Sequence, residues 1–481
     1  MFNTFVSQVL QNCRIHPEKP ALSFVERPTL SYGLLERHIA GVYRLLQSHG
    51  VGKGTPVVLA ASRGPGFIFA YTALQALGAL VSPVDPQTPG ARLAYIRETL
   101  GARLTFWPGA LYDSEDAALL DEVTSDAPLP DTVPSLEESA DVMFTSGTTG
   151  ASKGVLLTHG NLACAIAHIN TYVGNGPDDV ELCPMPLSHS FGLARMRCIL
   201  SMGGHMVVVD GITPPKRLFS MMEQHHVSGL GMVGPAWTLL YKLSGSRISR
   251  FKDQLRYLEL GSAAMQPEEK KRLAELLPTT HVVMHYGLTE ASRAAFLDFH
   301  NEEDKLNTVG KAGPYSELCI ADEGGNLLPA GEEGEICVRG SMVSRGYINA
   351  PSCFTPDGFF RTGDLGRMDV DGYVTIIGRI KEMINVGGEK VTPAEVEKVL
   401  NALPGIAESA CVAMPDPILG EAVAAFLVPE PGASMPVLQT ILPMLAGKLE
   451  KFKQPKRLYR IDALPRTVSG KLQRNALKEY L

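Results

Sequence analysis

The residues with the clearest chemical potential lie in one short segment, Thr145–Gly154, which reads Thr-Ser-Gly-Thr-Thr-Gly-Ala-Ser-Lys-Gly. Glycines let backbone N–H groups approach anionic oxygens, hydroxyls add hydrogen-bond donors, and lysine adds positive charge, so the segment predicts a phosphate-binding loop. A Walker A loop is excluded, because it needs Gly-Lys-Ser/Thr and a helix directly after it, whereas Lys153 follows Ser152 and precedes Gly154. The alternative is a flexible glycine- and threonine-rich hairpin.

A second segment, Tyr286-Gly-Leu-Thr-Glu290, ends in a carboxylate and follows the strand-like run His281–Met284. A carboxylate at the C-terminal end of a strand, beside a hydroxyl, is well placed to hold Mg²⁺ against nucleotide phosphates. The alternative for Glu290, taken alone, is a loop carboxylate in water.

Two further groups stand near the end of the chain. Asp364 and Arg379 flank a predicted hairpin, and a carboxylate is the usual acceptor for a ribose diol, which an arginine can join. Lys471 follows a Ser-Gly turn, and an ammonium on a flexible stem can neutralise charge that develops in a transition state. Taken singly, Asp364 is more typical of a turn residue, Arg379 of a surface cation and Lys471 of a solvated charge.

These groups need a scaffold, and the first part of the chain alternates helical and strand patterns. Apolar residues at helical spacing run over 34–47 and 67–80, whereas 56–60 and a run that begins at 79–81 read as buried strands. Such alternation predicts βαβ units and a mostly parallel sheet. Residues 108–140 are acidic and proline-rich, which predicts a surface connection.

The pattern changes twice in the last third of the chain. Between about 310 and 345, short apolar segments separated by glycine-rich turns predict a small antiparallel β unit. After Gly378 a compact α+β domain is predicted, with helices over 394–400 and 437–449 and strands over 410–413 and 423–428. The expected fold class is therefore α/β, with a large N-terminal domain, residues 1–378, and a small C-terminal domain, residues 379–481.

Composition narrows the class of protein. The 481 residues are 45% hydrophobic and 20% charged, which is typical of a soluble globular protein. A net charge of −7 lacks the excess of basic residues that is typical of nucleic-acid-binding proteins, so nucleic acid is not an expected partner. No apolar stretch is long enough to cross a bilayer, and the N-terminus lacks the pattern of a secretory signal. Eight scattered cysteines without a Cys-x-x-Cys pair fit neither a zinc site nor a disulfide framework, so we expect a cytoplasmic protein.

In their order along the chain, the glycine-rich loop, the Tyr-Gly-Leu-Thr-Glu segment, Asp364, Arg379 and the late Ser-Gly-Lys resemble the adenylate-forming superfamily. It comprises acyl- and aryl-CoA synthetases, peptide-synthetase adenylation domains and firefly luciferase. The resemblance runs from about residue 15 to the C-terminus. It implies that ATP and Mg²⁺ convert a carboxylic acid to an acyl-adenylate, which then passes to the thiol of coenzyme A or of a carrier protein's phosphopantetheine.

The resemblance also implies roles for individual residues. Residues 1–378 become the adenylation core, and 379–481 become a mobile domain that rotates between the half-reactions around a hinge at Lys381. Lys471 looks like the catalytic lysine that bridges the substrate carboxylate and the α-phosphate, Thr289 lies near that phosphate, and Glu290 is the Mg²⁺ ligand. The ATP phosphates are expected at Thr145, Ser146, Gly147, Thr148, Thr149, Gly150 and Lys153, the adenine at Gly261, Ser262, Ala263, Tyr286 and Gly287, the ribose at Asp364 and Arg379, and the pantetheine at Gly387 and Gly388.

His189-Ser-Phe-Gly192 looks like the family's substrate-side motif, which implies roles for His189, Phe191 and Gly192. No Asp stands between Pro184 and Arg197 to pair with an α-ammonium, which favours an acyl or aryl acid over an amino acid. Arg195 and Arg293 depart from the expected pattern; each either holds an anionic or hydroxylated substrate tail or faces solvent, and solvent is the favoured position. Gly229, Gly231 and Gly234 are expected to leave room for a sizeable acyl group.

The leading hypothesis is a stand-alone acyl-CoA synthetase for a medium or aromatic carboxylate. The nearest alternative is a ligase that loads a separate carrier protein. An alternative of another class is a nucleotide-binding protein without turnover, which the presence of Lys153, Glu290, Asp364, Arg379 and Lys471 disfavours.

Overall fold

The computed structural model describes residues 2–62, 64–107, 110–112, 122–130, 133–145, 152–466 and 472–481. Contacts divide these residues into two compact units. The first unit contains residues 2–318 and 338–354 as far as they are described, and the second contains 319–337 and 355–481. The second unit therefore includes strands that precede residue 379, and the hinge at Lys381 stays a prediction.

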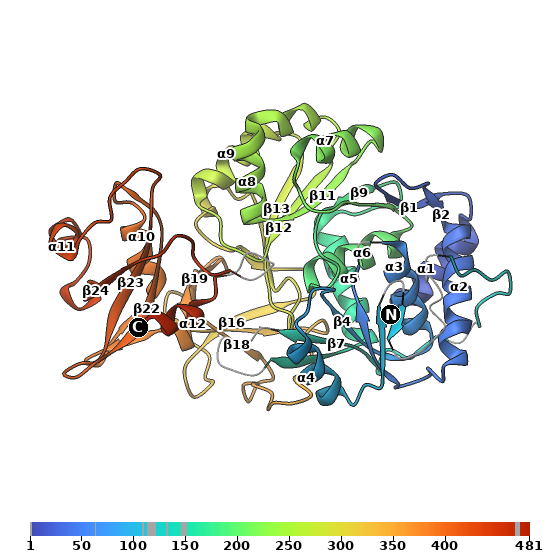
Figure 1. Cartoon of the computed structure of the whole chain (residues 1–481), viewed down its shortest axis with the longest axis horizontal. Coiled ribbons are helices and arrows are strands. Elements are labelled where there is room, and N and C mark those ends of the chain that lie inside the picture. Colours follow the sequence, from blue (N-terminus) through green and yellow to red (C-terminus); the bar gives the residue numbers. More distant parts are fainter. Residues whose placement is uncertain are drawn as a thin grey trace. The chain divides into compact units, whose positions relative to one another are not determined.

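A nine-stranded sheet organises the first unit (Figure 1). Its six central strands, in the order β13-β12-β11-β9-β10-β1, are parallel, and the strands at its edges are antiparallel. Parallel strands of this kind are buried on both faces, which explains their apolar composition. The strands are β1 Pro20–Phe24, β2 Leu30–Ser31, β9 Val180–Cys183, β10 His205–Val208, β11 Gly229–Val233, β12 Tyr257–Gly261, β13 His281–Tyr286, β14 Ala295–Asp298 and β15 Lys311–Ala312.

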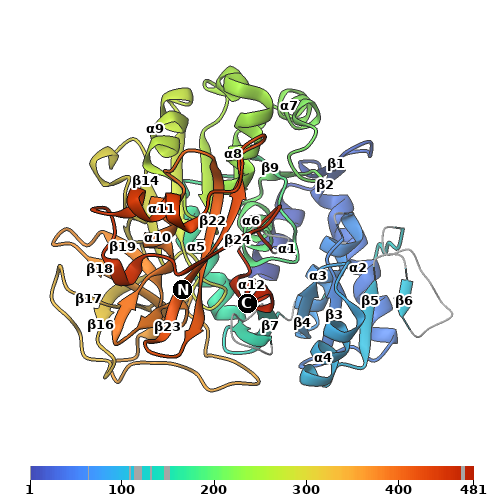
Figure 2. The ribbon, with the colours of Figure 1, turned by 60° about the vertical axis from the view of Figure 1, so that its left-hand side comes forward.

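A second sheet of the same unit has six strands in the order β6-β5-β3-β4-β7-β8 (Figure 2). The four central strands are parallel, and β6 and β8 are antiparallel. The strands are β3 Pro56–Ala60, β4 Leu80–Val84, β5 Leu104–Trp107, β6 Ala110–Tyr112, β7 Ser139–Thr145 and β8 Lys153–Thr158. The prediction of mostly parallel βαβ sheets is confirmed.

Helices cover both sheets. Figure 1 shows α7, α8 and α9 on one side of strands β11–β13, and α5 and α6 on the other. Helix α5 begins with a capping box, in which Thr158 and Asn161 each accept the other's backbone N–H. The helices are α1 Phe5–Ile15, α2 Tyr32–Ser48, α3 Pro65–Ala76, α4 Gly90–Leu100, α5 His159–Val173, α6 Ser190–Met202, α7 Pro215–Gln224, α8 Gly234–Ser244 and α9 Pro267–Leu276.

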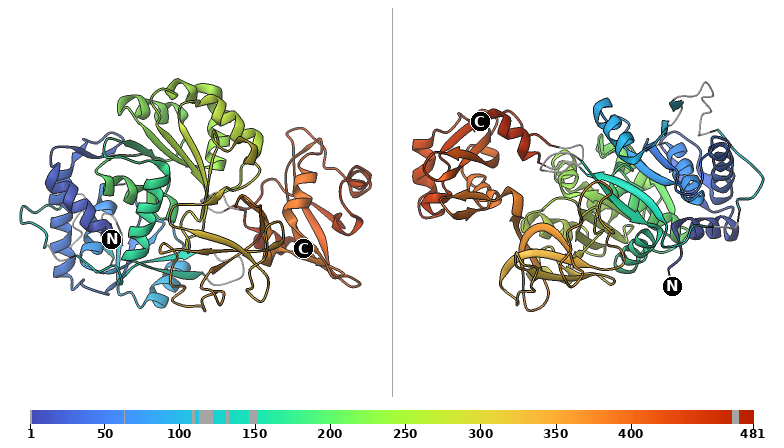
Figure 3. Two further views of the ribbon diagram at one scale, coloured as in Figure 1. Left: turned by 180° about the vertical axis from the view of Figure 1, so that it is seen from behind. Right: turned by 90° about the horizontal axis from the view of Figure 1, so that it is seen from below.

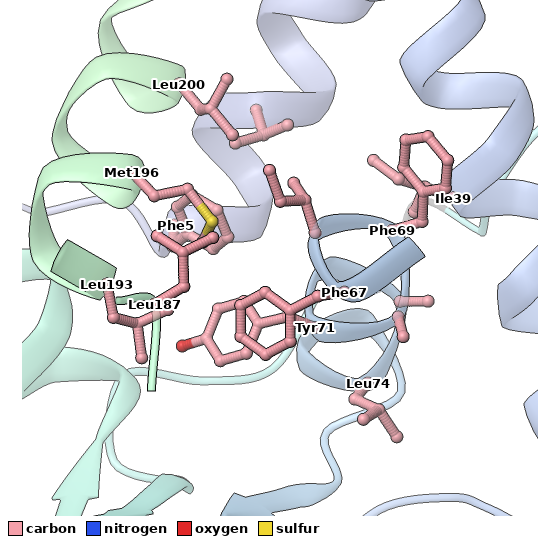
Figure 4. Packing of buried hydrophobic residues seen from close by; sticks show 14 of the residues in the cluster. Phe5, Ile39, Phe67, Phe69, Tyr71, Leu74, Leu187, Leu193, Met196 and Leu200 are labelled. Atoms are coloured by element: carbon pink, nitrogen blue, oxygen red, sulfur yellow. The ribbon is translucent and has the colours of Figure 1, made fainter. Parts of the chain in front are cut away.

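The largest apolar core of the first unit lies where α1, α2, α3 and α6 meet (Figure 4). Phe5, Phe67 and Met196 are at most 1% exposed and come from three different helices. Helix α3 is buried on nearly all sides, which matches its almost wholly apolar sequence. Burial of each large side chain contributes about 1.5–3 kcal/mol.

A buried carboxylate fixes this helical layer to strand β7. Asp141 accepts hydrogen bonds from Tyr71 Oη at 3.0 Å and from Gln75 Nε2 at 2.7 Å, both on α3, and pairs with Arg197 on α6. Because an unpaired buried charge is costly, these contacts hold the position of the strand that leads into residues 146–151.

The second unit contains two sheets and shorter helices (Figure 3). The four-stranded sheet consists of β16 Glu317–Ala321, β17 Glu333–Arg339, β18 Phe360–Met368 and β19 Val374–Arg379. The five-stranded sheet consists of β20 Ile384–Val386, β21 Glu389–Val391, β22 Ile406–Asp416, β23 Gly420–Pro429 and β24 Arg457–Arg460. The helices are α10 Pro393–Leu400, α11 Leu438–Leu445 and α12 Arg474–Leu477.

Among the described residues, no helix combines the length and the apolar composition that a membrane span requires.

Candidate active site

The strands on either side of the glycine-rich loop pair with each other. Thr145, at the end of β7, stands opposite Lys153, at the start of β8, and Ser152 Oγ donates a hydrogen bond to the Thr145 carbonyl. A strand, not a helix, follows the loop, which confirms that it is not a Walker A loop. Ser146, Gly147, Thr148, Thr149 and Gly150 lie outside the described residues.

Lys153 and Glu290, predicted separately as phosphate and Mg²⁺ ligands, share one partner. The Lys153 ammonium lies 4.4 Å from the centre of the Tyr347 ring, and Tyr347 Oη donates a 2.7 Å hydrogen bond to Glu290 Oε1. A cation and the carboxylate expected to bind Mg²⁺ are thereby held close to one tyrosine, the combination that a nucleotide triphosphate with its metal requires.

The segment that carries Tyr347 joins the two motifs through its backbone. Ile348 N donates to the Gly154 carbonyl at 2.9 Å, and Ser344 N donates to the Glu290 carbonyl at 2.7 Å. Ile348 also packs on Gly154, where an added Cβ would stand 2.7 Å from Ile348 Cγ1. The last glycine of the loop motif is therefore needed for this close approach. The sequence offered no chemical motif at 343–349 from which this role could be predicted.

The Tyr-Gly-Leu-Thr-Glu segment forms a tight turn after β13. Leu288 N donates to the Ala291 carbonyl at 3.0 Å, and Thr289 and Glu290 are half-buried. No group of three or more His, Cys, Asp or Glu side chains among the described residues forms a metal site. A single half-buried carboxylate nevertheless fits Mg²⁺ delivered with ATP, because such an ion is typically bound by one or two carboxylates and the substrate phosphates.

The residues expected around adenine lie at the ends of β12 and β13. Gly261 leaves the space that the His285 imidazole occupies, since an added Cβ would overlap that ring. Ser262 has a left-handed backbone, with φ of +68°, and is exposed, whereas Ala263 is half-buried and Tyr286 is buried. Gly287 approaches the backbone of Arg293, where an added Cβ would stand 2.5 Å from Arg293 N.

The expectation that Arg195 faces solvent is wrong. Its side chain is fully buried on α6 and pairs with Glu181 and, at 2.9 Å, with Glu259. Arg195 Nη2 also donates to Asn175 Oδ1 at 3.1 Å. Protein groups thus occupy most of its donors, and it belongs to a buried network of opposite charges.

Arg293 does not face solvent either, because it is 2% exposed. Its Nε donates to Glu259 Oε1 at 3.0 Å, and its guanidinium lies 4.8 Å from the centre of the Phe191 ring. Neither arginine could be placed from sequence alone, because their carboxylate partners lie on strands β9 and β12 and meet them only in the folded chain.

The glycines expected to leave room for a large acyl group, on β11 and at the start of α8, face side chains of the protein instead. At Gly229 an added Cβ would overlap the Tyr257 ring, and at Gly231 and Gly234 it would stand 2.9 Å from Met185 Cε and Met265 Cγ. These glycines therefore make room for side chains of the protein itself.

The substrate-side motif opens helix α6. His189 precedes the helix, is half-buried, and its Nε2 has no hydrogen-bond partner among the described residues. Burial lowers the pKa of His189 despite the opposing charge of Asp85. Phe191 packs edge-on against His285, with ring centres 4.6 Å apart, and Gly192 approaches the Pro186 carbonyl too closely to carry a side chain.

In the second unit, the predicted ribose-binding pair is formed. Asp364 on β18 and Arg379 on β19 stand opposite each other, and Arg379 Nε lies 2.7 Å from Asp364 Oδ1. Asp364 is 4% exposed, so the arginine balances a carboxylate that is largely removed from water.

Lys381 lies in the short 3-10 turn after β19 and is exposed. Gly387 and Gly388 join β20 to β21 with φ of +63° and +97°, a backbone that itself favours glycine. Their contact with pantetheine stays a prediction. Lys471 lies outside the described residues.

Comparison with known proteins supports one family. Residues 9–348 match the family model of the AMP-binding enzyme, and residues 395–471 match that of the AMP-binding enzyme C-terminal domain. A sulfoacetate–CoA ligase of Cupriavidus necator is 30% identical to the chain, with 100% of this chain and 98% of that protein covered.

Two solved structures are also similar to this chain over at least 98% of its length. ATP-bound MatB from Rhodopseudomonas palustris superposes with a TM-score of 0.87 and 28% identity, covering 100% of this chain and 99% of that one. The o-succinylbenzoate coenzyme A synthetase MenE from Bacillus subtilis, in complex with ATP and magnesium ion, has a TM-score of 0.87 and 25% identity, covering 98% and 99%.

Proposed function

Because this chain belongs to the AMP-binding enzyme family and is an AMP-forming ligase that joins a carboxylic acid to coenzyme A through an acyl-adenylate, we propose roles for its residues in that reaction. The observation that carries the proposal is the hydrogen bond of 2.7 Å between Tyr347 Oη and Glu290 Oε1, with the Lys153 ammonium over the same ring.

In the first half-reaction the substrate carboxylate attacks the α-phosphate of ATP, and pyrophosphate leaves. Two anions approach each other, so positive charge must offset their repulsion and stabilise the pentavalent phosphorus. Mg²⁺ supplies part of that charge when it is bound. Glu290 would hold the ion, Lys153 would bind the outer phosphates, and Lys471 would bridge the carboxylate and the α-phosphate. Thr289, beside Glu290, would contact the α-phosphate.

Two groups of residues would hold the nucleoside. Gly261, Ser262, Ala263, Tyr286 and Gly287 would line the adenine, and Asp364 would accept the ribose hydroxyls while Arg379 holds that carboxylate in place. In the second half-reaction the thiol of coenzyme A would replace AMP, with Gly387 and Gly388 beside the pantetheine arm and residues 379–481 rotating at Lys381.

The proposed substrate is a compact acid that is not an amino acid. No aspartate between Pro184 and Arg197 is available for an α-ammonium. The space beside Gly229, Gly231 and Gly234 is filled by protein side chains, which disfavours a long acyl chain there. His189, whose Nε2 has no hydrogen-bond partner within the described part of the chain, is the proposed hydrogen-bonding group for the acid.

ATP–pyrophosphate exchange tests this proposal without assuming an acceptor. We expect exchange with short acids, including sulfoacetate and dicarboxylates, weaker exchange with ferulate and octanoate, and none with amino acids. Absence of exchange with every acid would favour a nucleotide-binding protein without turnover.

The acceptor itself is tested separately. Coenzyme A and a purified carrier protein, each presented to the adenylated enzyme, are expected to yield acyl-CoA and no loaded carrier. Loading of the carrier without acyl-CoA would establish the carrier-loading alternative.

A further inference from the structure

One oxygen of a buried carboxylate contacts both ends of the turn that carries the proposed Mg²⁺ ligand. Glu259 Oε1 accepts a hydrogen bond of 3.0 Å from Arg293 Nε and lies 2.7 Å from His285 Nδ1, a close contact that lacks hydrogen-bond geometry. His285 immediately precedes Tyr286, and Arg293 stands three residues after Glu290. Residues 286–292 are therefore held between two side chains that meet at a single atom.

The other oxygen of Glu259 is also occupied, because Arg195 Nη1 donates to Oε2 at 2.9 Å. Glu259 is 0% exposed, and Arg293 and His285 are 2% and 7% exposed. Burial alone would raise the pKa of Glu259, yet the nearby Arg293, Arg195 and His285 hold it well below its usual range. An ionised carboxylate in this position constrains its partners strongly, because separating them would leave buried charge unpaired.

The turn is further constrained at its C-terminal end. Arg293 has a left-handed backbone with φ of +56°, a conformation that strains a residue with a side chain and persists only where contacts enforce it. Its carbonyl accepts a hydrogen bond of 2.8 Å from His168 Nε2. The strained residue is thus fixed through both its backbone and its side chain.

We propose that Glu259 is a positioning residue for ATP binding: by holding His285 and Arg293, it fixes the turn in which Tyr286 lines the adenine and Glu290 binds Mg²⁺. This inference rests on the proposed nucleotide-binding role of that turn. Glu259 itself touches no nucleotide in the proposal, and its effect is transmitted through the backbone of residues 286–292.

The same network contains a matched control. Glu181 on β9 is 1% exposed, pairs with Arg195 and accepts a hydrogen bond of 2.7 Å from Tyr257 Oη. These two partners, Arg195 and Tyr257, lie outside the turn. Glu181→Gln and Glu259→Gln therefore remove equivalent buried charges, and only the second removes the charge that holds the turn.

The test compares the two variants in the full chain by thermal unfolding, by calorimetric titration with ATP and Mg²⁺, and by the KM and kcat of ATP–pyrophosphate exchange. We expect both to lose stability. Glu259→Gln should also weaken ATP binding about tenfold and raise the KM for ATP, the factor typical when a supporting partner of a metal site is lost. Glu181→Gln should stay within about twofold of the parent protein in ATP affinity.

Equal ATP affinity of the two variants would overturn the proposal. If neither variant folds, His285→Gln provides a second test, because it removes one of the two contacts to the turn and leaves both arginines paired with Glu259. We expect it to weaken ATP binding by a smaller factor, and unchanged affinity would overturn the proposal. Failure of the parent protein to bind ATP would instead refute the proposed function.

Discussion

Tyr347 joins two motifs that are more than a hundred residues apart in sequence. Its hydroxyl donates a hydrogen bond to Glu290, and its ring lies under the Lys153 ammonium. One side chain therefore contacts both the proposed Mg²⁺ ligand and the proposed phosphate ligand. Motif spacing predicted Lys153 and Glu290 because their residue types carry recognisable chemistry. Tyr347 could not be predicted in the same way, since its role arises from the pairing of residues 343–349 with β8 and with the turn at 288–291.

Tyr347→Phe keeps the ring and removes only the hydroxyl. We expect the KM for Mg²⁺–ATP to rise about tenfold, because Glu290 loses a supporting hydrogen bond, while the melting temperature changes little. Exchange kinetics at varied Mg²⁺ concentration measure this. An unchanged Mg²⁺ dependence would show that the hydroxyl does not orient Glu290.

The buried charges illustrate a different limit of sequence reasoning. A glutamate within the apolar run Tyr257–Leu260 and an arginine within helix α6 are signals of buried ion pairs, because charged residues are rarely buried without a partner. The partners themselves could not be identified from sequence, since they meet only when β9, β12 and α6 pack together.

The type of each element was predicted better than its ends. Strand β3 was predicted at its observed bounds, whereas the helix expected over 67–80 ends at Ala76. Leu77 and Gly78 turn the chain before β4, with Gly78 at φ of +67°, although their composition continues the apolar pattern. The spacing of apolar residues predicts which face of a helix is buried, but it does not predict the residue at which the helix ends.

The antiparallel pair β13–β14 predicts a pH dependence of stability. His281 Nε2 lies 3.2 Å from Asp298 Oδ2, and this hydrogen bond raises the pKa of His281 against the opposing effect of burial. A raised pKa in the folded state stabilises the fold below the usual histidine value of 6.5, and this contribution is lost as the pH rises through the raised value.

His281→Gln should therefore destabilise the protein more at pH 6 than at pH 8.5. The expected difference is up to about 1 kcal/mol, a limit set by the partial exposure of His281. Denaturant unfolding of both proteins at the two pH values measures it. An equal loss of stability at both values would show that the pair does not depend on the histidine charge.

For the whole molecule, the sequence predicted the α/β class and the family, while the observed division of the chain differs in detail. The strands of residues 319–337 and 355–378 group with the C-terminal residues in the second unit. The sequence pattern predicted a separate β unit from about residue 310, but it could not show with which other residues those strands pack. Rotation of residues 379–481 about Lys381 remains a prediction.

Lys471→Ala tests whether this lysine acts in adenylation and not in thioester formation. We expect adenylation to fall roughly a hundred- to a thousandfold, the usual effect of removing one charge-stabilising group from a transition state. Thioester formation from a supplied acyl-adenylate should be largely retained. An equal loss in both half-reactions would contradict the assigned role of this lysine.

The most direct test of the central claim is the identity of the products. With ATP, Mg²⁺, coenzyme A and an accepted acid, chromatography with mass detection should show AMP and acyl-CoA in equal amounts, both dependent on the acid. Formation of ADP in place of AMP, or of AMP without any acyl-CoA, would contradict the assignment of this chain as an AMP-forming acid–CoA ligase.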